Sequence, residues 1–326
     1  ILLAAETDPT VTVGGILETI GGNIRVGGSE LFVTEACEYT NSFLSFFPTM
    51  EIILNIEADH LDFFKDIEDI RHSFRLFAEK LDEKGTLIIN SDIYHLDEFL
   101  AGLSSKVITF GSDPQKSDYS AADITYDAWA RPSFTLLVDK RPEGTISLGV
   151  PGEHNVYNAL SAIAAARVLD IPMEAIKRGL GHFHGTNRRF EVKGEVGGLT
   201  IIDDYAHHPQ EIAATLAAAK NYPHKKIWCV FQPHTYSRTA ALLDDFARVL
   251  LAADEVILAD IYAAREVNKL GVSANDIALK IEEYGKRVHY LPSFDEIETF
   301  ILENCVPGDL LITMGAGDIV KVGEKL

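Results

Sequence analysis

Two aspartates, a tyrosine and two adjacent histidines stand together in IIDDYAHHPQEI, residues 201–212. These residue types could hold a metal ion, relay protons or bind an anionic substrate. A zinc site is the weaker interpretation, because adjacent histidines usually point apart and no Cys or carboxylate stands at ligand spacing. A hydrolase relay is weaker still, because the chain has no G-x-S-x-G elbow. If IID ends a strand and Pro209 opens a helix, the loop between them presents Tyr205, His207 and His208.

Two further stretches add basic side chains. PHTYSRT follows an apolar run and supplies His234 and Arg238, and GTNRRF supplies Arg188 and Arg189. The formal net charge is −20, so an anionic ligand needs a local basic group. Three loops with Arg or His side chains therefore predict an anion site. For any single residue, helix capping or packing in the core remains the alternative.

Acidic residues and a histidine follow two predicted strands, residues 30–36 and 51–57. If these strands are neighbours, Glu35 and His60 could converge on a divalent ion, although His is an uncommon ligand for Mg²⁺. The alternative is that His60 packs beneath the next helix and that two aspartates cap this helix, namely Asp59 and Asp62.

Two other stretches could contact a nucleotide. In GEHNVYNALSA, Asn155 and Asn158 are three residues apart and lie on one helix face, where paired amides can read a purine edge. Alternatively, Asn155 only caps the helix, and the spacing does not separate the two interpretations. GAGDI, residues 315–319, is typical of a glycine-rich anion turn, but glycines also serve tight strand-to-helix turns.

The elements that must position these residues follow an α/β pattern, in which short apolar runs alternate with helical periodicity and indicate mostly parallel sheets. We expect two domains, residues 1–184 and 185–326. The first contains predicted strands 30–36, 51–57, 85–91 and 106–112, a helix from Ile67 to Leu81, antiparallel strands in 124–152, and a helix over 155–170. The second is expected to be Rossmann-like, with strands and helices alternating from residue 188 onward.

The composition limits the possible functions. The chain has 326 residues, of which 49 are acidic and 29 basic, which disfavours binding to nucleic acid. Its three cysteines are too few for a disulfide framework, which favours a reducing cytoplasm. The apolar runs are strand-sized or interrupted by charge, so no membrane span is expected. The first residues lack an initiator Met and indicate a piece of a longer polypeptide.

Taken in order, seven motifs resemble those of the Mur ligase family: EACEYTNSFL, NIEADHLDFF, GEHNVYNALSA, NRRFE, DDYAHHP, FQPHTYSRT and GAGDI. DDYAHHP and FQPHTYSRT are most similar to members that add L-alanine to UDP-N-acetylmuramate. The resemblance implies a central ATPase-type domain, truncated at its start, followed by the Rossmann-like domain. It also implies that ATP and Mg²⁺ are cofactors, and that the muramate carboxylate becomes an acyl phosphate that the alanine amine displaces.

The resemblance also assigns roles residue by residue. The implied Mg²⁺ ligands are Glu35 and His60. The implied nucleotide contacts are His154, Asn155, Asn158 and Arg189. The implied contacts to the muramoyl and alanyl groups are Tyr205, His207, His234 and Arg238. The residues expected to carry the reaction are Glu35, His60, Arg189 and His207.

The chain departs from the family pattern in two places. Thr235 stands where many relatives have Arg, and no G-x-x-x-x-G-K-[ST] phosphate loop occurs in the 326 residues. The family's N-terminal UDP-binding domain is therefore expected as a missing partner from the same chain, and these residues alone are expected to be inactive. The alternatives are a recycling ligase that attaches a preformed tripeptide, and a non-catalytic nucleotide-binding module.

Overall fold

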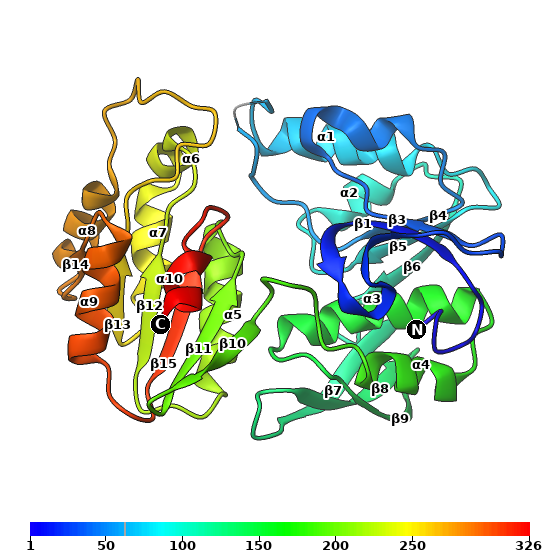
Figure 1. Ribbon diagram of the computed structural model, residues 1–326. Coiled ribbons are helices and arrows are strands. Elements are labelled where there is room, and N and C mark those ends of the chain that lie inside the picture. Colours follow the sequence, from blue (N-terminus) through cyan, green and yellow to red (C-terminus); the bar gives the residue numbers. More distant parts are fainter. Residues whose placement is uncertain (62) are drawn as a thin grey trace. The chain divides into compact units, whose positions relative to one another are not determined.

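The computed structural model describes residues 1–61 and 63–326. Within them the chain forms two compact units. The first unit comprises Ile1–Asp127 and Arg131–His184, and the second comprises Ala128–Ala130 and Gly185–Leu326. The fold is mixed α/β with mostly parallel sheets (Figure 1), which confirms the predicted fold class.

The main sheet of the first unit has the strand order β4-β5-β6-β7-β8-β9. Neighbours are parallel from β4 to β7 and antiparallel from β7 to β9, as the β-rich stretch 124–152 predicts. The strands are β4 (Met50–Ile53), β5 (Thr86–Asn90), β6 (Lys106–Phe110), β7 (Tyr119–Tyr126), β8 (Pro132–Val138) and β9 (Arg141–Ser147).

Helices cover both faces of this sheet (Figure 1). One core contains the buried side chains of α3 and α4, and another contains those of α1 and α2. The helices are α1 (Ile67–Ala78), α2 (Leu96–Leu100), α3 (His154–Val168) and α4 (Met173–Gly181). The spacing of Ile70 and Phe77 explains why α1 buries one face, as predicted. The Asp66 side chain caps α1 by accepting from the Asp69 amide, whereas the predicted cap Asp62 lies outside the described residues.

The two strands expected to be neighbours lie in different sheets. The predicted strand 30–36 contains β3 (Phe32–Thr34), which pairs in parallel with β1 (Thr10–Leu17). In turn, β1 pairs with β2 (Gly22–Arg25) in an antiparallel arrangement, and the strand order is β2-β1-β3. The expectation that β3 adjoins β4 is therefore wrong. The unpredicted strand β1, with its TVTV sequence, pairs with β3 instead. Short 3₁₀ helices span Glu18–Ile20 and Tyr39–Ser45.

The second unit has the strand order β10-β11-β15-β12-β13-β14, with only the β10–β11 pair antiparallel among the described strands. The strands are β10 (Glu191–Val196), β11 (Leu199–Asp204), β12 (Ile227–Phe231), β13 (Glu255–Leu258), β14 (His289–Tyr290) and β15 (Leu310–Met314). This is the alternating pattern predicted for a Rossmann-like unit.

Helices also cover both faces of the second sheet. Buried side chains of α5, α7 and α8 share one core, and those of α9 and α10 share the other. The helices are α5 (Pro209–Lys220), α6 (Tyr236–Ala241), α7 (Leu243–Leu250), α8 (Ala274–Glu283), α9 (Phe294–Asn304) and α10 (Val320–Lys325). The helical stretch 239–253 is interrupted at Leu242, which separates α6 from α7.

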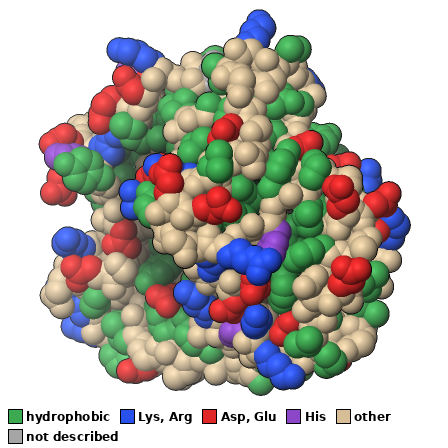
Figure 2. Space-filling model, turned by 90° about the vertical axis from the view of Figure 1, so that its left-hand side faces the viewer, with side chains coloured by type: hydrophobic (Ala, Val, Ile, Leu, Met, Phe, Trp, Pro, Cys, Tyr) green, Lys and Arg blue, Asp and Glu red, His purple; other side chains and the backbone are tan. Residues whose placement is uncertain are grey.

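The surface carries both signs of charge despite the acidic composition. Figure 2 shows acidic and basic side chains interspersed with apolar ones on the face it presents. Among the described residues, no helix is both long enough and apolar enough to cross a bilayer.

Candidate functional site

In the second unit, the structure brings together four residues singled out from the sequence. Tyr205 follows β11, and its ring lies 5.4 Å from the His207 ring. The His207 ring lies 5.8 Å from that of His234, which follows β12. An Arg238 Nη1 atom lies 3.3 Å from His234 Nδ1. We call Tyr205, His207, His234 and Arg238 the substrate-side cluster.

The first turn of α5 fixes His207. Glu211 accepts hydrogen bonds from the backbone amides of His207 at 2.9 Å and His208 at 3.2 Å, and lies 3.2 Å from His207 Nδ1. The His208 side chain caps α5 in return. Burial opposes ionisation of Glu211, but the charge of His207 and the donated amides hold the pKa of Glu211 below its ordinary value.

Glu211 is a site residue that the sequence reasoning missed. Its signal was present, because Glu three residues after a helix cap is the pattern of a capping box. Glu211 also pairs with Arg189 at 3.4 Å. It therefore connects Arg189, an implied nucleotide contact, with His207, an implied substrate contact.

The start of α6 holds the other half of the cluster. Thr235 caps this helix by accepting from the Arg238 amide, so the residue that replaces the expected Arg has a structural role here. Backbone bonds join Thr235 to Tyr262 at 2.9 Å and Tyr262 to Pro233 at 2.8 Å. The Tyr262 ring stacks on that of His234, with centroids 5.7 Å apart and an interplanar angle of 15°.

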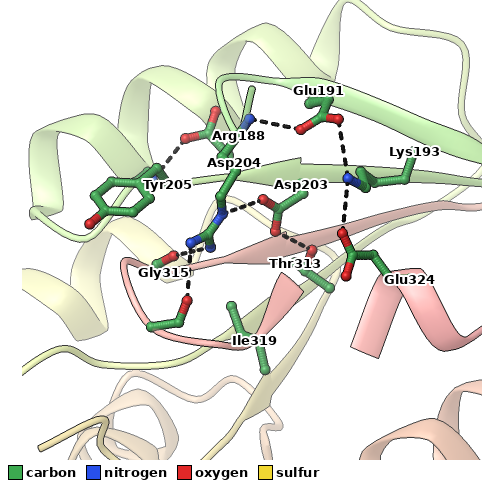
Figure 3. A network of polar contacts seen from close by, with 12 residues as sticks. Arg188, Glu191, Lys193, Asp203, Asp204, Tyr205, Thr313, Gly315, Ile319 and Glu324 are labelled. Atoms are coloured by element: carbon green, nitrogen blue, oxygen red, sulfur yellow. Dashed lines mark hydrogen bonds and ion pairs between the residues drawn. The ribbon is translucent and has the colours of Figure 1, made fainter. Parts of the chain in front are cut away.

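Arg188, which the sequence suggested for the anion site, points into the protein. Figure 3 shows its guanidinium directed at Asp203 and at the turn after β15. Nε donates to Asp203 at 2.9 Å, and the two terminal nitrogens donate to carbonyl oxygens of Gly315 at 2.7 Å and Gly317 at 3.0 Å. The expectation that Arg188 presents its charge to an anion is therefore wrong, whereas the Arg189 side chain is 51% exposed.

Asp204 organises the strand end beneath the cluster. Its carboxylate accepts from the amides of Phe190 and Ala206, both at 2.8–2.9 Å, and from the Thr215 hydroxyl at 3.1 Å. Burial raises the pKa of Asp204 to about 6, while these donors oppose the rise. The DDY sequence gave no signal of this role.

In the first unit, the proposed metal ligands contact other partners. Glu35 accepts from the Gly14 amide at 2.6 Å, and His60 Nε2 lies 3.3 Å from Glu38. The bond to His60 is the main cause that lowers the pKa of Glu38. The His60 ring also lies 4.6 Å from that of Tyr39. Within residues 1–61 and 63–326, no three His, Cys, Asp or Glu side chains gather as a metal-binding group.

The amide pair lies on one face at the start of α3. Asn158 donates to the Asn155 side chain at 3.1 Å, and Asn155 donates to the Pro151 carbonyl at 2.7 Å. His154 is the first residue of α3. The Asn155 amide thus secures the preceding turn and orients Asn158, while the N-cap position belongs to Glu153.

Comparison with known proteins places this chain in a family. Residues 10–166 match the Mur ligase middle domain, and residues 188–317 match the domain described as "Mur ligase, glutamate ligase domain". A UDP-N-acetylmuramate--L-alanine ligase of Lachnospira eligens is 62% identical over 326 residues, which cover 100% of this chain and 71% of that relative. The chain belongs to the Mur ligase family.

Other relatives agree with this assignment. A Mur ligase of the same description from Agathobacter rectalis is 59% identical and is again covered to 71% of its length. The solved UDP-N-acetylmuramate-alanine ligase of Thermotoga maritima superposes with a TM-score of 0.82 at 27% identity, over 99% of this chain and 69% of that one. A murein peptide ligase of Psychrobacter arcticus, 24% identical with a TM-score of 0.69, shares the fold.

Proposed function

We propose that this chain contributes the nucleotide-side and substrate-side residues of a ligase that joins L-alanine to the carboxylate of UDP-N-acetylmuramate. The observation that supports the proposal is the substrate-side cluster, within a chain that matches alanine-adding relatives from its first residue to its last. Arg238 and His234 offer positive charge and hydrogen-bond donors to an anionic substrate group, as such recognition requires.

Residues of each unit have a proposed contact to ATP. In the first unit, Asn155 and Asn158 would hold the adenosine side of ATP, since their paired amides lie on one helix face. In the second unit, Arg189 would approach the phosphates, because its side chain is 51% exposed while Glu211 restrains it. When bound, ATP supplies the phosphoryl group that activates the carboxylate.

The proposed Mg²⁺ ligands have less structural support than the proposed contacts to ATP. The motifs that carry Glu35 and His60 make them our candidate ligands. The described structure nevertheless directs Glu35 to Gly14 and His60 to Glu38, so it does not present an assembled metal site.

The test is a chimera in which these residues replace the matching part of the Lachnospira eligens ligase. Phosphate release is measured with UDP-N-acetylmuramate, L-alanine, ATP and Mg²⁺, and each component is then omitted in turn. We expect turnover that depends on L-alanine. Absence of turnover in a folded chimera, while the parent ligase is active, would contradict the proposal. Faster turnover with a tripeptide than with L-alanine would favour a recycling ligase.

A further inference from the structure

Arg188 is held in one conformation from both sides of its backbone. Its φ of +63° lies in the left-handed region, which a residue with a long side chain adopts only under constraint. The constraints are a hydrogen bond from the Arg188 amide to Glu191 at 2.8 Å and one from the Tyr205 amide to the Arg188 carbonyl at 2.6 Å. These backbone constraints therefore fix the direction in which the guanidinium points.

All three guanidinium nitrogens of Arg188 donate to the protein itself. Their acceptors are the Asp203 carboxylate, whose side chain is 0% exposed, and the carbonyls of Gly315 and Gly317. Asp203 in turn accepts from the Thr313 hydroxyl in β15 at 2.7 Å. Arg188 thus joins the ends of β11 and β15 (Figure 3).

The 315–317 turn that Arg188 holds packs closely against the loop that carries the substrate-side cluster. A Cβ atom on Gly317 would come within 2.7 Å of the Tyr262 ring and 2.2 Å of the Gln232 amide oxygen, so no side chain fits there. Gln232 holds the far side of the turn through the Ile319 amide at 3.2 Å. Because the Tyr262 ring stacks on that of His234, a displacement of the turn would also displace His234.

Arg188 also touches the cluster directly. Its guanidinium carbon lies 4.9 Å from the centre of the Tyr205 ring, a cation–π distance. The side chain is 22% exposed, and each of its three guanidinium nitrogens already donates one hydrogen bond to the protein. The neighbouring Arg189 stands 5.6 Å from the same ring but is half exposed.

We propose that Arg188 is a positioning residue for the substrate-side cluster: it fixes the 315–317 turn and the Tyr205 ring without itself contacting substrate. The role in catalysis rests on the proposed ligase function, but the effect on the turn does not. Removal of the guanidinium should loosen the turn, displace Tyr262 and His234, and weaken binding of L-alanine. Lysine should recover little, because one ammonium cannot reach three acceptors set around a planar fork.

The first experiment measures amide hydrogen exchange in the 326-residue chain itself. In Arg188→Met, the amides of Gly315 and Ile319 should exchange at least about tenfold faster, while those of β12 stay protected. The double variant Arg188→Met/Asp203→Asn should show the same local change. It also removes the buried carboxylate that Arg188→Met alone would leave without its cation. The matched control is Arg248→Met, which removes an exposed arginine of α7 paired with Asp244. Unchanged exchange at residues 315–319, or an equal increase in β12, would refute the positioning role.

The second experiment measures the KM and kcat of the chimera described above. Arg188→Met should raise the KM for L-alanine by about tenfold, as expected when charged hydrogen bonds that hold a site are lost. The KM for ATP is the internal reference and should not change. Partial unfolding would instead lower kcat and leave both KM values unaltered. A rise in the KM for ATP alone would mean that Arg188 serves the nucleotide and would overturn the proposal. If the unsubstituted chimera has no turnover, the ligase function fails while the exchange result still decides the role of Arg188 in the turn.

Discussion

Arg238 is the cation of the substrate-side cluster, and its hydrogen bond to His234 fixes where its charge lies. We predict that Arg238→Ala in the chimera costs on the order of 1.5–3 kcal/mol in kcat/KM, the range for hydrogen bonds to charged groups. Arg238→Lys should restore only part of the loss, because an ammonium cannot replace a planar fork. Steady-state kinetics with varied L-alanine and UDP-N-acetylmuramate check this prediction. Unchanged kinetics in Arg238→Ala would show that the residue only supports the loop.

Glu51 in β4 is a buried carboxyl that the proposed reaction does not use. It is 2% exposed, and neither carboxylate oxygen has a hydrogen-bond partner among the described residues. Burial raises the pKa of Glu51 from 4.5 to about 8. The folded state therefore binds more protons than the unfolded state between these values, and stability falls as the pH rises through this window.

Removal of the Glu51 carboxyl should flatten this pH dependence. We expect Glu51→Gln to abolish a slope of at most about 1.4 kcal/mol per pH unit in the free energy of unfolding. Urea unfolding between pH 5 and about 8 measures the slope. The control is Glu68→Gln, since that side chain is 77% exposed. Identical slopes in the two variants would contradict the assignment.

Residue types and spacing were sufficient to expect Arg and His side chains from the loops after β11 and β12 in one place, because a parallel sheet brings its strand ends to one edge. They were not sufficient to identify side-chain partners. Arg188 and Arg189 are adjacent, yet one is bonded to buried Asp203 and the other is half exposed. This difference depends on a left-handed backbone at Arg188 and on the 315–317 turn, which is remote in sequence.

At the scale of elements, the capping box of α5 connects a local sequence rule to the site. We predict that Glu211→Gln lowers the free energy of unfolding by about 1 kcal/mol, because Gln keeps an oxygen for the capping box but loses the negative charge that faces His207, Arg189 and the start of the helix. The lowered pKa of Glu211 contributes stability above its ordinary value of 4.5, and this contribution is lost as the pH falls through the folded pKa. The deficit of the variant should therefore shrink in acid. Urea titrations at neutral and acidic pH test this, with Glu282→Gln in α8 as the exposed control. Equal unfolding of the two variants at every pH would show that the charge of Glu211 does not stabilise the fold.

Elements with strong local signals were predictable, and those defined by their partners were not. The helix α1 has a clear apolar face, and α5 begins at a proline, so both follow from the sequence. By contrast, β1 contains two glycines and pairs with a strand of three residues, so its existence depends on β2 and β3. That dependence is why the neighbour of β3 was mistaken.

At the scale of the whole molecule, the chain enters the second unit twice. The first passage is only Ala128–Ala130, between β7 and β8. Ala130 is 0% exposed in the core that also contains Phe190 and Tyr222, and the Trp129 ring lies 5.8 Å from that of Tyr222. The predicted division at residue 185 assigned this segment to the other domain. A short turn between strands gives no periodic signal that would assign it otherwise.

The second unit should therefore be less stable when it is made from residues 185–326 alone. We expect this polypeptide to fold, because the rest of both its cores lies within it. Its free energy of unfolding should be lower by about 1–2 kcal/mol than in the whole chain, since it lacks the apolar and aromatic contacts of Ala130 and Trp129. Fluorescence of the buried Trp228 during urea unfolding measures the difference.

The comparison uses the 326-residue chain with Trp129→Phe, which leaves Trp228 as the single tryptophan and keeps an aromatic ring beside Tyr222. In that background, Ala130→Asp should lower the stability of the second unit at least as much as excision does, because it buries an unpaired charge. Ala101→Asp, at an exposed position, is the matched control. If residues 185–326 unfold at the same urea concentration alone and within the chain, Ala128–Ala130 contributes nothing to the second unit. Its boundary would then lie at residue 185.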